Sequence, residues 1–121
     1  MDFKEKKAIY LQIADYLCDE ILQGKYPESE RIPSVREFAA HVEVNVNTCM
    51  RAYDWLQSQE IIFTKRGLGY FVADGAKQSI TNMRKTEFFE EFLPELIKQM
   101  KTLNITQQEL LNEINKETDM A

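Results

Sequence analysis

The polar side chains that could do chemistry gather in one stretch of the chain, residues 31–72. Asn47, Thr48 and Arg51 lie between apolar residues of helical spacing, so a helix would expose them together. Short amides and hydroxyls suit phosphates and base edges, and an arginine can read guanine N7 and O6 through two hydrogen bonds. These residue types and spacings indicate contact with a nucleic acid.

Catalytic and metal-binding patterns are missing from the sequence. The one histidine, His41, has no second histidine or cysteine at ligand spacing, so we expect no metal site there. The sequence contains no G-x-S-x-G, no P-loop and no dinucleotide fingerprint. We therefore expect no enzyme, no catalytic residues and no cofactor.

Two short helices joined by a tight turn are predicted to position the polar residues. The first opens at Pro33-Ser34, where Ser34 and Glu37 have the spacing of a capping box. Asn45 is a good N-cap for the second. Each helix has one apolar face of helical period, formed by Val35, Phe38, Ala39 and Val42 in the first and by Cys49, Ala52, Tyr53 and Leu56 in the second.

A two-strand hairpin is predicted to follow, with strands 61–64 and 70–72. In the turn between them, Gly67 and Gly69 permit a close approach of the backbone to DNA, and Lys65 and Arg66 supply positive charge. Helix, turn, helix and a two-strand wing make a DNA-reading arrangement. The expected fold is mostly α with a small β-hairpin wing (α+β).

A further helix, from about Ala8 to Gln23, is predicted to precede this stretch. Its buried face is expected to consist of Ile9, Ile13, Tyr16, Leu17 and Ile21.

Cysteine usage and apolar runs bear on the compartment. Cys18 and Cys49 fall at apolar helical positions, which predicts two reduced core thiols. The sequence has no signal peptide and no apolar span long enough to cross a membrane. We therefore expect a cytoplasmic protein that does not associate with a membrane.

Charge is less indicative of a nucleic-acid partner than the motifs are. The formal net charge is −5, which is mild evidence against strong non-specific DNA binding. The basic residues within 31–66 sit at predicted helix starts, on exposed helix faces and at the wing tip; they are Arg31, Arg36, Arg51, Lys65 and Arg66.

A second pattern of helical period begins after a small-residue linker near residues 74–76. Pro94 interrupts its apolar stripe, and it either kinks one helix or stands in the first turn of a new one. Thr106 and Glu109 repeat the capping-box spacing and predict a final helix from Gln107 to about Lys116. A tail this small cannot form a useful core alone, so its stripe either folds back or pairs with a second copy.

Four ordered blocks over residues 9–73 resemble the winged helix-turn-helix of GntR-type bacterial transcription regulators. They read IYLQI at 9–13, IPSVREFA at 32–39, VNVNTCMRAY at 44–53 and GLGYFV at 67–72. The N-x-N-T-x-x-R-A-Y form and the short tail resemble the YtrA subfamily in particular. The resemblance implies that residues 1–75 form a DNA-binding domain and residues 76–121 a helical dimerisation tail.

The resemblance also implies a homodimeric regulator, most plausibly a repressor, on a two-fold operator in double-stranded DNA in the bacterial cytoplasm. The tail is too short for a large ligand-sensing domain, and the sequence identifies no effector. The implied DNA contacts are Ser34, Arg36, Asn45, Val46, Asn47, Thr48, Arg51, Lys65, Arg66, Gly67 and Gly69. The implied dimerisation residues are Phe88, Phe89, Phe92, Leu93, Leu96, Ile97, Met100, Leu110, Leu111 and Ile114.

Three positions depart from the family pattern. Family members often have arginine or proline where Val46 stands, so one usual contact is either missing or replaced by an apolar contact with a thymine methyl. The family usually has a glycine near Ser29, and the absence of that glycine here implies a different turn geometry. The family also commonly has a glycine at a left-handed helix exit where Glu60 stands.

An alternative function is a protein-interaction module that has kept the winged fold and lost DNA binding. The acidic balance and Val46 favour this alternative slightly, whereas Arg36, Thr48, Arg51 and the wing tip oppose it.

Overall fold

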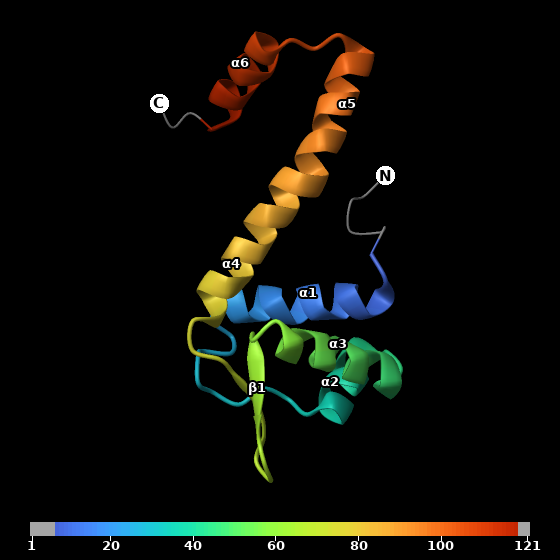
Figure 1. Cartoon of the computed structure of the whole chain (residues 1–121), viewed down its shortest axis with the longest axis vertical. Coiled ribbons are helices and arrows are strands. Elements are labelled where there is room, and N and C mark those ends of the chain that lie inside the picture. Colours follow the sequence, from blue (N-terminus) through green and yellow to red (C-terminus); the bar gives the residue numbers. More distant parts are fainter. Residues whose placement is uncertain (1–6, 119–121) are drawn as a thin grey trace. The chain divides into compact units, whose positions relative to one another are not determined.

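The computed structural model describes residues 7–118, which fall into two compact units divided between Arg84 and Lys85. The first unit contains α1 (Ile9–Leu22), α2 (Val35–Val42), α3 (Val46–Ser58), β1 (Ile62–Lys65) and β2 (Gly69–Val72) (Figure 1). It also holds most of α4 (Ala76–Glu87). The fold is mostly helical with a two-strand antiparallel wing, as the sequence predicts.

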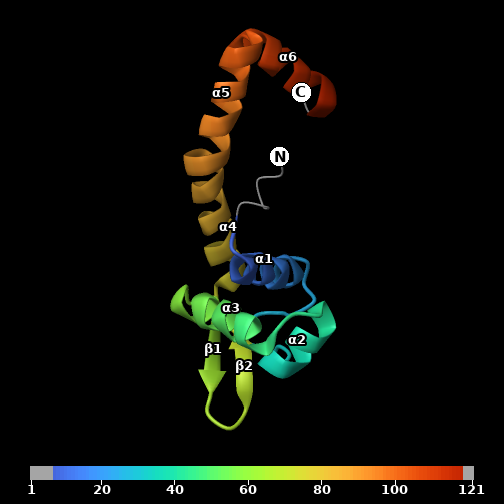
Figure 2. The ribbon, with the colours of Figure 1, turned by 90° about the vertical axis from the view of Figure 1, so that its right-hand side faces the viewer.

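The core of the first unit is made by α1 and α2, which both pack against α3. The predicted core face of α3 is buried throughout, and so are Val35, Phe38 and Ala39 of the predicted face of α2. Val42, the fourth residue of the α2 face, is half-buried and packs against the edge of the core. The wing projects from beneath these helices (Figure 2), and its register pairs Ile62 with Val72 and Lys65 with Gly69.

The start of each central helix has the cap that the sequence predicts. The Glu37 amide donates to Ser34 Oγ at 3.1 Å and the Ser34 amide donates to Glu37 Oε1 at 3.0 Å, which completes the capping box. Asn45 Oδ1 accepts from the Asn47 amide at 2.7 Å and caps α3.

Two of the five apolar residues predicted for the buried face of α1 are exposed. Ile9 and Tyr16 face solvent, whereas Ile13, Leu17 and Ile21 are buried together with Ala14 and Cys18. Steps of four residues drift by about 40° around a helix of 3.6 residues per turn. Ile9, three such steps before Ile21, has therefore rotated off the face that Ile21 occupies.

The turn at Ser29 was expected to differ from a glycine-containing turn, and that expectation is wrong. Ser29 has φ +71°, in the left-handed region that glycine favours. Its amide donates to the Val72 carbonyl at 2.8 Å, and its hydroxyl donates to Asp74. These hydrogen bonds hold a non-glycine residue in the strained conformation. Glu60, with φ +60°, occupies the left-handed helix exit as predicted.

The first unit extends beyond residue 75 because the start of α4 belongs to its core. Ala76 and Ile80 are buried, and Met83 packs against the same cluster. Arg84 forms an ion pair with Asp19 at 2.7 Å and donates to the Asp15 carbonyl. The functional division into residues 1–75 and 76–121 stays a prediction.

The second unit contains five residues of π-helix (Phe88–Phe92), α5 (Leu93–Leu103) and α6 (Gln107–Thr118). Pro94 stands in the first turn of α5, and the π-helix leads directly into α5 without a break. Proline cannot donate to the preceding turn and its ring crowds that turn, and the backbone there adopts the wider π spacing. Leu103 is the last residue of α5, and Asn104 ends the helix in the left-handed conformation.

The start of α6 has the second predicted capping box, in which the Glu109 amide donates to Thr106 Oγ1 at 3.1 Å and the Thr106 amide donates to Glu109 Oε1 at 3.0 Å. No residue of the π-helix, α5 or α6 is buried. No helix among residues 7–118 is long and apolar enough to cross a membrane.

Candidate nucleic-acid interface

The first turns of α3 present the predicted polar residues to solvent. Asn47 is exposed and Thr48 is half-buried, and Val46 keeps 37% of its surface accessible. The Asn45 side chain is also exposed, and its amide group remains free to donate after Oδ1 has capped the helix. This end of α3 therefore offers one apolar and several polar side chains.

Arg51 is held in place by Tyr10, a residue that the sequence reasoning did not assign to the interface. The Arg51 guanidinium carbon lies 4.0 Å from the centre of the Tyr10 ring, which is a cation–π contact. Together with Ala8, Ile9, Asn47 and Thr48, these two residues line an open depression where α1 and α3 meet. Tyr10 belongs to the IYLQI block of the sequence, but that block does not indicate a contact with Arg51, because the two residues lie on α1 and α3 and meet only when these helices pack.

Met50 is a second exposed residue on α3 that the predicted set omits. It retains 40% exposure, and its sulfur accepts a weak hydrogen bond from the Tyr70 hydroxyl at 3.9 Å. Tyr70 meets Tyr53 edge-on at 4.9 Å, and the Tyr53 hydroxyl donates to the Pro33 carbonyl at 2.7 Å. This series of contacts fixes the start of α2, the middle of α3 and the wing relative to one another.

On α2, Ser34 and Arg36 differ in how free they are to bind a ligand. The Ser34 oxygen accepts from the Glu37 amide, which leaves its own hydroxyl hydrogen to donate. Arg36 is exposed, and within residues 7–118 it pairs with neither Glu37 nor Asp54. Its guanidinium donors are therefore available.

The wing tip carries the predicted cations and glycines. Gly67 and Gly69 have φ +77° and +110°, so both stand where side chains are strained. Lys65 Nζ lies 4.6 Å from the centre of the Phe71 ring, while Arg66 is exposed at the turn. A Cβ at Gly69 would lie 3.2 Å from Arg31 Nε. The Arg31 side chain therefore occupies the space that a side chain at position 69 would need.

Protonation within the first unit is set by burial and by capping. Burial raises the pKa of Cys18 to about 12 and that of Cys49 to about 11, so both thiols are protonated at neutral pH. Backbone and side-chain hydrogen bonds from Ser34 lower the pKa of Glu37, which remains ionised and caps α2. Neither effect creates a nucleophile or a general base.

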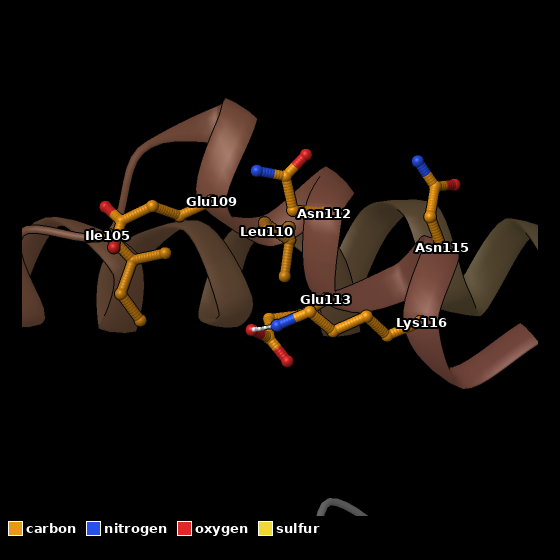
Figure 3. A pocket seen from close by; sticks show the side chains of 7 residues that line it. All are labelled: Ile105, Glu109, Leu110, Asn112, Glu113, Asn115 and Lys116. Atoms are coloured by element: carbon orange, nitrogen blue, oxygen red, sulfur yellow. Dashed lines mark hydrogen bonds and ion pairs between the residues drawn. The ribbon is translucent and has the colours of Figure 1, made fainter.

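The second unit has an open depression along α6 (Figure 3). Ile105 and Leu110 line it beside an ion pair in which Lys116 Nζ lies 3.3 Å from Glu113 Oε1. No group of three or more potential metal ligands occurs among the residues with described positions. The depression belongs to the exposed tail and brings together none of the predicted DNA-contacting residues.

Comparisons with known proteins agree with this arrangement. Residues 9–72 match the family described as bacterial regulatory proteins, gntR family. A Bacillus subtilis protein named as an uncharacterized HTH-type transcriptional regulator, YhcF, is 37% identical over 117 residues, which are 97% of this chain and 95% of that one.

Two further relatives are similar over most of their length. The HTH-type transcriptional repressor YtrA of Bacillus subtilis is 33% identical over 97 residues, or 80% of this chain and 74% of that protein. A solved structure of a GntR-family regulator from Bacteroides thetaiotaomicron has a TM-score of 0.81 at 49% identity, covering 93% of this chain and 97% of that one.

Proposed function

Since the chain belongs to the gntR family of bacterial regulatory proteins, we propose that it represses transcription by binding a two-fold operator as a homodimer. The chain is a transcription regulator with a DNA-binding helix-turn-helix, and it is not an enzyme. The observation that carries the proposal is the set of exposed donors on α2, α3 and the wing. Arg36, Arg51 and Arg66 form no ion pair with any acid in the described chain.

Each part of the interface has a distinct task in this proposal. The first turns of α3 enter the major groove, where Asn47 and Arg51 contact base edges and Val46 contacts a thymine methyl. Ser34, Asn45 and Thr48 donate to phosphates. The wing tip, Lys65 to Gly67, follows the DNA backbone or the adjacent minor groove.

The tail supports a dimer because none of its apolar side chains within residues 88–118 is buried. Phe89 keeps 61% of its surface exposed, and Phe88 and Phe92 stack with ring centres 5.1 Å apart. Stable exposure of such a cluster is unfavourable in water. A second copy of the tail would cover it and would set two wings on two half-sites.

Repression is the proposed direction because the relative YtrA is named a repressor. A dimer bound over a promoter would exclude polymerase in the bacterial cytoplasm. No effector or cofactor forms part of the proposal.

The test replaces Arg36 and Arg51 by alanine together and measures affinity for the DNA upstream of the protein's own gene. We expect the affinity for DNA to fall on the order of 100-fold, because two good contacts are lost. The circular dichroism spectrum should stay unchanged, and the protein should remain a dimer. Lys77→Ala, an exposed lysine on α4, is the matched control and should bind normally.

The outcome separates the contact assignment from the function. Undiminished binding by the double variant would show that the assigned contacts are wrong. If the native protein is a dimer but binds no duplex, the interaction module becomes the better account.

A further inference from the structure

The wing has a third strand-like segment that the two-strand description leaves out. Arg31 forms an antiparallel bridge with Phe71. On either side of it, the Ile32 amide donates to the Tyr70 carbonyl at 3.0 Å and the Val72 amide donates to the Glu30 carbonyl at 2.9 Å. The segment before α2 is therefore fixed to the outer edge of β2.

The pairing places Arg31 on the face of the wing opposite the protein core. Residues paired across neighbouring strands share a face, so Arg31, Phe71 and Phe63 project to the same side. Ile62 and Val72 project to the other side and are buried, and Tyr70 contacts Tyr53 there. The face that carries Arg31 is the outer face of the wing.

Two cationic side chains, those of Arg31 and Lys65, lie on this outer face. The Arg31 side chain lies over the bare backbone of Gly69, where a Cβ would stand 3.2 Å from Nε and 3.6 Å from Nη2. Lys65 is the register partner of Gly69, and its Nζ lies 4.6 Å from the Phe71 ring centre and 5.8 Å from that of Phe63. Both cationic side chains therefore lie on the face of the wing that Gly69 leaves without a side chain.

The charge on this face is not neutralised within residues 7–118. Neither Arg31 nor Lys65 forms an ion pair or a side-chain hydrogen bond there. The acid that Arg31 influences is Glu37, whose carboxylate accepts from the Ser34 amide in the capping box. Two positive groups on one face of the wing, neither with a counterion among residues 7–118, suit a ligand with closely spaced negative charges.

We propose that Arg31 binds a phosphate of the DNA backbone together with Lys65 on the outer face of the wing, and that Gly69 lacks a side chain so that Arg31 can lie there. This inference rests on the proposed DNA binding and adds a contact to it. A contact with phosphate strengthens binding to every sequence alike, since it reads no base. Gly69 then acts through Arg31 instead of approaching DNA itself.

The experiment is fluorescence anisotropy with two duplexes, the upstream promoter DNA and a scrambled version, at several salt concentrations. Arg31→Gln should weaken binding to both duplexes by the same factor and lower the salt slope by about 0.9, the loss of one phosphate contact. Lys77→Gln removes the same charge from α4 and should leave the slope unchanged. An equal change in the control would overturn the assignment, because bulk charge would then be the cause.

Gly69→Ala separates the two roles of the glycine. If Gly69 serves Arg31, this variant lowers the slope as Arg31→Gln does, and the Arg31→Gln, Gly69→Ala double variant loses nothing more. A further loss in the double variant would show that Gly69 approaches DNA directly and would overturn the role given to it here. Thermal unfolding of each variant confirms that the strained glycine position still folds.

Failure of this inference is distinct from failure of the proposed function. Native protein that shows no salt-dependent binding to either duplex would contradict DNA binding altogether. Native binding combined with an unchanged slope for Arg31→Gln would overturn the Arg31 contact alone.

Discussion

At the scale of single residues, the contact between Tyr10 and Arg51 connects the first helix to the proposed base reader. The ring holds the guanidinium at 4.0 Å before any DNA arrives, which lowers the entropy cost of binding. We expect Tyr10→Leu to weaken promoter binding by about 2- to 5-fold, since an exposed cation–π contact contributes roughly 0.5–1 kcal/mol.

Tyr10→Phe is the control for that prediction. It keeps the ring and should bind like the native protein in the same anisotropy measurement. Tighter binding by Tyr10→Leu would contradict the account, because it would mean that Arg51 must leave the ring to reach DNA.

The buried thiols predict how stability depends on pH. Their folded-state pKa values, about 12 for Cys18 and about 11 for Cys49, lie above the ordinary 9.0 that applies once the chain unfolds. Unfolding therefore releases protons above pH 9, so the stabilisation is complete below that pH and is lost as pH rises through 11 to 12. Urea unfolding midpoints should fall steadily above pH 9.

Alkylation with iodoacetamide gives an independent check on the same thiols. Folded protein at pH 8 should resist modification, and urea should expose both cysteines to it. Rapid modification of folded protein would show that the two side chains are not buried.

At the scale of elements, the sequence predicts best the features whose partners are close along the chain. The caps of α2, α3 and α6 join residues two or three positions apart, so the spacing alone indicates them. The contacts of Arg51 with Tyr10 and of Arg31 with Gly69 join distant segments and depend on how the elements pack. The π-helix before Pro94 likewise has no spacing rule that would indicate it in advance.

The exit of α3 offers a test of local strain. Glu60 has φ +60° and is exposed, so replacing it by glycine removes a steric cost. We expect Glu60→Gly to stabilise the protein by up to about 1 kcal/mol in urea unfolding.

The neighbouring position provides the matched control. Gln59 has φ −88°, where glycine brings no relief, so Gln59→Gly should destabilise by about 0.5–1 kcal/mol. Equal effects of the two substitutions would rule out strain at Glu60 as the explanation.

At the scale of the whole molecule, the proposed dimer requires the tail to pair two chains on one operator. We expect Phe89→Ser to weaken self-association by about 10-fold or more, since it removes a large aromatic side chain from the proposed interface. Sedimentation equilibrium measures the change. Affinity for a two-half-site duplex should fall with it, while affinity for a single half-site stays the same.

Leu103→Ser is the control for the tail, because Leu103 is 65% exposed and lies outside the proposed dimerisation set. It should leave the dimer intact. A native protein that is monomeric at all accessible concentrations would remove the proposed role of the tail.

The most direct test of the central claim is fluorescence anisotropy of the native protein against the DNA upstream of its own gene, titrated at several salt concentrations beside a scrambled duplex. Tight binding with a steep salt slope, which scrambling weakens by about 1,000-fold or more, is the predicted result. Equal affinity for the two duplexes, or no binding to either, would contradict sequence-specific DNA recognition by this protein.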